Sequence, residues 1–187
     1  VADDGTAVGS AHDKNPDGNA AILVGDKVVE IDLSSIAVKH GMSCCTGITP
    51  DATYVVGWYW EYDEANSYFA QQYGAVIPFC YDVLKDRVTV PIEGERIYNE
   101  NAATAIKAVA PDRTLLGYQQ SQGIHSIIWA DENIPYEYVH FEYNDDYEPV
   151  FSLGDTQNLL SQSGRYIYGK AIDYANGQAV LSAAYDR

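Results

Sequence analysis

Four short apolar segments along this chain each follow a turn and end at a glycine. Their sequences are DGTAVG at residues 4–9, DATYVVG at 51–57, DRTLLG at 112–117 and SGRYIYG at 163–169. The four closing glycines are separated by 48, 60 and 52 residues. A recurrence at about this period is typical of arrays or propeller blades rather than of one mixed domain.

Each repeat is predicted to carry up to four strands, which we name A to D, and the second repeat is the most complete. Its strands are expected at residues 43–48, 53–62, 73–81 and 87–92. Pro50 fixes φ in the turn between strands A and B, and Asp51 can bond its own backbone there. Pro111 and Asp112 recur in the third repeat. The Ala-rich residues 101–110 precede them, so their position predicts strand A despite a local resemblance to a helix.

The two outer repeats are predicted to be incomplete. The first offers strands B, C and D at residues 6–10, 19–24 and 27–33, with a two-residue hairpin turn at Gly25 and Asp26. The fourth offers strand A near residues 156–161, strand B at 166–171 and strand C at 178–185. We therefore expect that another propeller segment or another chain covers the outer edges, because long exposed edges invite aggregation.

The fold class predicted from these patterns is all-β, with β-propeller-type blades of four-stranded antiparallel sheets. About four repeats are expected, at residues 1–34, 35–98, 99–150 and 151–187, with the outer two incomplete. Together they are expected to form a single, partial propeller domain over residues 1–187.

The repeats resemble the blades of bacterial β-propellers of the TolB-like or extracellular HAF type. The best match is SQSGRYIYG at residues 161–169, and IIW at residues 127–129 matches strand C of such a blade. The first three repeats depart from the Asp-Gly turn or its surroundings, and the 60-residue spacing implies long insertions. Propellers of this type serve as scaffolds, as ligand binders and in some cases as enzymes, so the resemblance implies no catalytic residues.

The charge of the chain narrows its partners. With 11 Lys and Arg against 27 Asp and Glu, the net charge is −16. Nucleic-acid binding needs clustered Lys and Arg, so this balance argues against a nucleic-acid partner. No apolar run approaches the roughly 18 residues of a membrane helix, so membrane insertion is not expected. The 16 tyrosines and few lysines favour a secreted or cell-surface bacterial protein.

Three cysteines, Cys44, Cys45 and Cys80, cannot all pair within the chain. If Cys44 and Cys45 lie on strand A and Cys80 on strand C, two strand spacings of about 9.6 Å separate them. That exceeds the roughly 7 Å reach of a disulfide. Buried free thiols are therefore predicted, with a strained Cys44–Cys45 bridge as the alternative.

One local motif has the pattern of a cation site, at residues 13–19. Oxygen ligands at alternate positions followed by Gly18 suit a calcium loop, because alternation points them inward and glycine permits the turn. Val24 stands where an EF-hand has its Glu, so an EF-hand is excluded. The predicted cofactor is a calcium ion in a short hairpin loop. The alternative is a plain turn between strands B and C. The candidate ligands are Asp13, Asn15, Asp17 and Asn19.

Aromatic side chains mark the candidate binding surface. Trp58, Trp60 and Tyr62 share one face of strand B by their spacing of two. They form either a platform for sugar rings or packing against the next blade. Tyr-rich acidic segments follow at residues 62–73 and 131–149, and loops on rigid scaffolds often carry function. The candidate ligand-binding residues are Trp60, Tyr62, Tyr68, Tyr136, Tyr138 and Tyr143.

The sequence contains no nucleophile elbow, P-loop or dinucleotide fingerprint. The function predicted first is therefore a non-catalytic binding or scaffold module that recognises a protein or a glycan. One alternative is a glycan-active hydrolase or lyase that uses carboxylates at the central face of a propeller. The other is a structural segment of a larger assembly.

Overall fold

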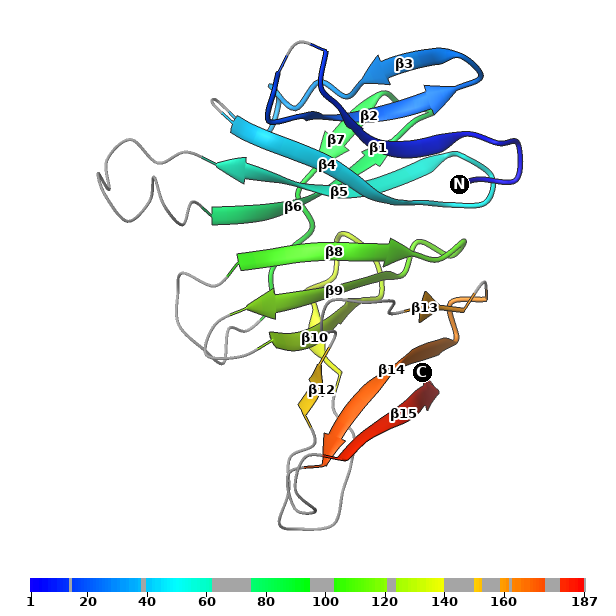
Figure 1. The fold of residues 1–187 in the computed structure, drawn as a ribbon, viewed down its shortest axis with the longest axis vertical. Coiled ribbons are helices and arrows are strands. Elements are labelled where there is room, and N and C mark those ends of the chain that lie inside the picture. Colours follow the sequence, from blue (N-terminus) through cyan, green and yellow to red (C-terminus); the bar gives the residue numbers. More distant parts are fainter. Residues whose placement is uncertain are drawn as a thin grey trace.

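In a computed structural model the chain folds into four antiparallel β-sheets that follow one another in sequence order (Figure 1). The structure describes residues 1–13, 15–37, 40–61, 75–94, 103–120, 124–139, 150–152, 159–161, 163–173 and 179–186. Every regular element in these ranges is a strand. None of the described segments is therefore a helix long and apolar enough to cross a membrane. The all-β, blade-like fold class is confirmed.

The first three sheets follow the predicted strand order. The first sheet has three strands, the second and third have four, and neighbours in sequence pair throughout. The first contains β1 (Ala7–Ala11), β2 (Asn19–Val24) and β3 (Lys27–Glu30). The second contains β4 (His40–Ile48), β5 (Tyr54–Glu61), β6 (Ala75–Asp82) and β7 (Arg87–Thr89). The third contains β8 (Ala103–Val109), β9 (Leu115–Gln120), β10 (Ile124–Trp129) and β11 (Glu137–Tyr138).

Two predicted boundaries need correction. Residues 131–149 were expected to form one loop, but β11 lies within them and pairs with β10. Strand A of the fourth repeat is also split. Its two parts, β12 (Val150–Ser152) and β13 (Leu159–Leu160), pair with successive parts of β14 (Tyr166–Asp173), and β15 (Ala179–Asp186) pairs along the other side. Both short strands escape sequence reading because two or three residues show no periodicity.

A tight turn precedes strand B of each repeat, which is β1, β5, β9 or β14. Its third inner residue has a positive φ in all four sheets: 87° at Gly5, 57° at Ala52, 67° at Arg113 and 72° at Gly164. The residue before it accepts a side-chain hydrogen bond from the backbone two positions on, as when Thr53 N donates to Asp51 Oδ1. The same bond recurs at Asp4, Asp112 and Ser163. The predicted turn chemistry is thus present in each repeat.

Two of the glycines that end the four apolar segments, Gly57 and Gly117, lie beside a bulge. In the second and third sheets the register shifts by one residue beside Gly57 and Gly117. A Cβ at either position would overlap a backbone carbonyl of the first strand, that of Cys44 or Ala105. An aromatic side chain of the third strand, Phe79 or Trp129, covers the same spot. Since a carbonyl cannot move aside as a side chain can, only glycine fits.

The core lies between successive sheets as three apolar clusters. The first joins Ala20, Ile22 and Leu33 to Val55 and Phe79 of the second sheet. The second cluster packs the other face of that sheet on the third, and contains Tyr54, Val56, Cys80, Ile106, Leu115, Ile127 and Trp129. The third joins Leu116 and Val139 to Ile167 of the fourth sheet. Each inner sheet is therefore apolar on both faces, and the first and fourth lie at opposite ends of an open row (Figure 1).

The cysteines are free, as predicted. Cys45 and Cys80 are buried and Cys44 is half-buried. Strand β5 lies between β4 and β6, which separates Cys80 from the other two. Burial raises the pKa of both Cys45 and Cys80 to about 12, so neither is a reactive thiolate at neutral pH.

Candidate functional site

The predicted calcium loop is a hydrogen-bonded turn between β1 and β2. Asn15 Oδ1 accepts a bond of 3.0 Å from Asp17 N, and Asn15 Nδ2 donates to Asn19 Oδ1 at 3.0 Å. Asn19 Nδ2 donates to Glu30 Oε2 at 3.0 Å. Asp13 and Asp17 are exposed. Both amide oxygens thus already have donors from the chain, and calcium binding stays a prediction.

The aromatic face of β5 is directed toward the third sheet. Tyr54 and Val56 of this face belong to the cluster between these sheets, and Trp58 and Trp60 continue it by period two. Trp60 is half-buried and is the second-last residue of β5. Its Nε1 is buried and has no hydrogen-bond partner in the described part of the chain. Tyr62 and Tyr68 lie outside the described residues.

Tyr136 and Tyr138 are held by one buried glutamine. Gln119 Nε2 donates to the Tyr136 hydroxyl at 2.9 Å, and the Tyr138 hydroxyl donates to Gln119 Oε1. Their rings meet edge to face with centroids 5.7 Å apart, and Trp129 packs edge to face on Tyr136 at 5.3 Å. Tyr136 is only 4% exposed and belongs to the apolar cluster between the second and third sheets, so its ring is part of the packing. Tyr143 lies outside the described residues.

A second unpaired polar group faces the same sheet interface. Thr104 lies opposite Gln119 in the pairing of β8 and β9 and is 1% exposed. Its Oγ1 is buried, and no described group bonds to it. The end of β5 and the first residues of β8 lie on the same side of the molecule (Figure 1). One donor and one hydroxyl are thus left unsatisfied at one end of the interface between these two sheets.

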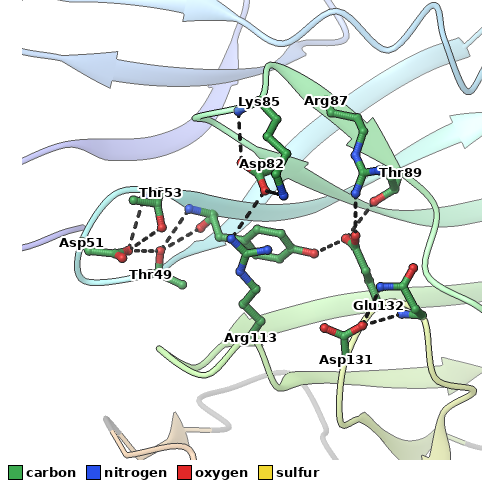
Figure 2. A network of polar contacts seen from close by, with 12 residues as sticks. Thr49, Asp51, Thr53, Asp82, Lys85, Arg87, Thr89, Arg113, Asp131 and Glu132 are labelled. Atoms are coloured by element: carbon green, nitrogen blue, oxygen red, sulfur yellow. Dashed lines mark hydrogen bonds and ion pairs between the residues drawn. The ribbon is translucent and has the colours of Figure 1, made fainter.

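The opposite end of this interface contains a polar network around Glu132 (Figure 2). Glu132 follows β10 and is 8% exposed. Its carboxylate accepts hydrogen bonds from the Tyr54 hydroxyl, from Thr89 Oγ1 at 2.8 Å and from Arg87 Nη2 at 3.2 Å. All three donors belong to the second sheet. A carboxylate of the third sheet is therefore fully occupied in joining the two sheets.

A second buried carboxylate, Asp82, lies in the same region (Figure 2). Lys85 Nζ is 2.9 Å from Asp82 Oδ2, and Arg113 Nη2 of the third sheet is 3.4 Å from it. The hydrogen bond from Lys85 lowers the pKa of Asp82 below its ordinary 3.8, against the opposing effect of burial. Arg113 also packs over the Tyr54 ring, 4.6 Å from its centroid. Asp82 is thus an ion-paired carboxylate that remains charged at neutral pH.

These contacts limit the chemistry of the described residues. An acid or base catalyst needs a carboxyl group free to exchange a proton, whereas Asp82 and Glu132 are both saturated by donors. No three His, Cys, Asp or Glu side chains in the described ranges are grouped so that they could hold a metal ion. The network has no sequence signature, because its members are separated by up to 78 residues.

Comparisons with known proteins found solved structures that align with this chain, TolB among them. No family model matches the chain, and no curated protein matches it. The crystal structure of TolB from Acinetobacter baumannii aligns with a TM-score of 0.48 and 13% sequence identity. The alignment covers 98% of this chain and 41% of TolB, so the chain spans less than half the length of that protein. The four sheets themselves, rather than this likeness, make the architecture blade-like.

Proposed function

We propose that this chain is a non-catalytic binding or scaffold module that recognises a protein or a glycan. The ligand surface lies at the end of the second and third sheets where β5 ends and β8 begins. Its residues are Trp60 and Tyr138, with Tyr136 beneath them and Tyr62, Tyr68 and Tyr143 in the connecting segments.

The observation that carries this proposal is the pair of buried, unpaired polar atoms at that end. A buried polar group without a partner costs about 1–3 kcal/mol of stability, so such a group is usually explained by water or a ligand. Trp60 Nε1 can only donate, and the Thr104 hydroxyl can donate or accept. Carbonyl and hydroxyl groups of a peptide or a sugar match both.

The directions of the strands support the same location. The chain leaves β5 at Glu61, beside Trp60. It also leaves the third sheet at Val139, whose N–H bonds to Ser126 O near the start of β10. The connecting segments that carry Tyr62, Tyr68 and Tyr143 therefore both begin at the end of the sheets that carries the unpaired atoms. At the other end the polar groups are mutually satisfied.

The proposal is tested with two near-isosteric variants. Thr104→Val removes the hydroxyl and Trp60→Phe removes the indole N–H. Each variant is measured on a glycan array and with extended peptides, and turnover of every bound glycan is assayed. We expect weaker binding, by about tenfold for one lost hydrogen bond, and no product. Tyr166→Phe in the fourth sheet is the control and should bind normally.

Stability measurements separate this function from a purely internal role. Removing an unpaired buried hydroxyl without changing the volume should leave Thr104→Val as stable as the parent or more stable. A stable Thr104→Val variant with unchanged binding would refute the ligand surface. Formation of product by the parent chain would refute the non-catalytic proposal and show that the chain is an enzyme.

A further inference from the structure

Two connecting segments meet where the second sheet joins the third. They are residues 90–94, which follow β7, and residues 130–136, which follow β10. Ile92 N donates to Glu132 O at 2.9 Å, and Trp129 Nε1 donates to Ile92 O at 2.9 Å. Both backbone groups of Ile92 are therefore bonded within the chain, and the two segments are fastened to each other.

Aliphatic side chains on these two segments are exposed to solvent. Val90 is 40% exposed, Ile92 48% and Ile134 50%, and Pro135 is also exposed. The turn before Ile134 closes through backbone groups, with Ile134 N donating to Asp131 O at 3.1 Å, so it does not require an aliphatic side chain. Single exposed apolar residues are common, but several on adjacent segments with a polar rim often indicate a contact with another molecule. We name Val90, Ile92, Ile134 and Pro135 the joint patch.

The charge around the joint patch has one sign. The two segments contain three acidic residues and no lysine or arginine. Glu132 is already paired, because Arg87 Nη2 lies 3.2 Å from its carboxylate. Glu93, beside Ile92, and Glu137, the first residue of β11, are exposed. Since complementary charges favour and orient association, the rim selects a partner that carries Lys or Arg.

The backbone at the joint patch leaves recognition to side chains. Pro91 has no N–H group, and the N–H groups of Ile92 and Ile134 are bonded within the chain. Strand β7 beside them is only three residues long. An added strand would therefore find few backbone partners here. An amphipathic helix needs none, because it binds through an apolar face.

We propose that the joint patch is a docking surface for a short amphipathic helix of another protein, with an aliphatic face flanked by Lys or Arg. The aliphatic face covers Ile92 and Ile134, and the cations lie near Glu93 and Glu137. A few half-exposed side chains bury much less than the roughly 1,200 Å² of a standard interface, so the binding is weak and salt-dependent. The joint patch adjoins Glu132, at the end of the sheets opposite the ligand surface proposed above, and is independent of it.

The test uses three synthetic helical peptides of about 18 residues, or five turns. The first has leucines spaced three and four residues apart on one face and lysines beside them. The second has the same composition in scrambled order, and the third has glutamate in place of lysine. Binding to the full chain is measured by fluorescence anisotropy. We expect the first peptide to bind saturably and at least about tenfold more tightly than either control.

Two outcomes of this titration would overturn the proposal. Equal binding of the scrambled peptide would show attraction by charge alone, without an apolar contact. An absence of saturable binding at about millimolar concentrations of the first peptide would show that the joint patch does not receive such a helix.

Substitutions locate the contact on the chain. Ile92→Gln and Ile134→Gln should each weaken binding of the first peptide by about fivefold, because each removes about half of one buried aliphatic side chain from the interface. Both side chains are exposed, so the melting temperature should not change. The control is Leu84→Gln in the turn between β6 and β7, which is 78% exposed and should bind as the parent does. Unchanged binding by both isoleucine variants, or an equal loss for Leu84→Gln, would overturn the assignment.

A last variant separates this surface from the proposed ligand surface. Trp60→Phe should leave binding of the first peptide unchanged. A loss of peptide binding in Trp60→Phe, with normal binding in the isoleucine variants, would place the helix on the ligand surface and overturn the joint patch as its site.

Discussion

The hydrogen bond between the Glu132 carboxylate and the Tyr54 hydroxyl should contribute measurably to the stability of the packing between the second and third sheets. Glu132→Ala removes the acceptor for three donors at once. The Tyr54 side chain is 1% exposed, so its hydroxyl loses its partner where water does not replace it, at a cost of about 1–3 kcal/mol. Thr89 is half-buried and adds up to about 1 kcal/mol. Arg87 is 55% exposed and adds little.

The expected loss for Glu132→Ala is therefore about 1–4 kcal/mol in the free energy of unfolding. Small domains have about 5–15 kcal/mol in total, so the variant should remain folded but unfold at clearly lower urea concentration. The matched control is Asp131→Ala. Among the described residues the Asp131 side chain accepts hydrogen bonds from Asn133 within its own turn, and its loss should cost less than about 1 kcal/mol.

A double-mutant cycle with Tyr54→Phe isolates the shared term. Tyr54→Phe removes only the hydroxyl and leaves the ring over which Arg113 packs. Once Glu132 is absent, the unpaired hydroxyl is a liability, so adding Tyr54→Phe should recover part of the loss. We expect a coupling of about 1–2 kcal/mol in urea unfolding. A coupling below about 0.5 kcal/mol, or an equal loss for Asp131→Ala, would refute a buried bond between the sheets.

Three further predictions concern pH and the repeated glycines. The pKa of Asp82 is lowered, so its ionised carboxylate stabilises the fold at neutral pH, and this stabilisation is lost as the pH falls below about 4. Asp82→Asn should therefore weaken the decrease in urea stability at acid pH, and an unchanged decrease would contradict this. Burial raises the pKa of Cys80 from 9.0 to about 12. The neutral buried thiol therefore contributes fully to the free energy of unfolding below pH 9, and this contribution disappears as the pH approaches 12. Cys80→Ala should therefore lose less stability than the parent between these values, and parallel curves would argue against a buried thiol. Gly117→Ala should lower the melting temperature markedly, because its Cβ overlaps the Ala105 carbonyl, whereas Gly9→Ala should not; equal effects would show that the close approach is not the reason for glycine.

The strands and turns were largely readable from local sequence. Pro50 and Asp51 predicted their turn because both act on their own backbone. Residues 103–109 were recognised as a strand only through the repeat, since their Ala-rich sequence has little β propensity. The split of the first strand in the fourth sheet and the two-residue β11 were missed. Segments this short owe their conformation to the neighbour with which they pair.

The candidate site was less predictable. The face shared by Trp58 and Trp60 followed from the alternation of side chains along a strand. The burial of Tyr136 did not, because its partners Gln119 and Trp129 reach it from other strands. Glu132 looked like one of many acidic residues in a chain of charge −16. Only the packing of the third sheet on the second directs it at Tyr54.

The sequence by itself determined the repeat, the turns and the glycines, because each depends on the conformation of a few adjacent residues. The tertiary structure decided which glycine is crowded and which is open. Gly9, Gly57 and Gly117 close similar segments, yet only the last two lie against a carbonyl of a neighbouring strand. It also decided which acids are saturated and which polar atoms stay unpaired. Those properties depend on groups brought together from distant parts of the chain, and a local pattern does not record them.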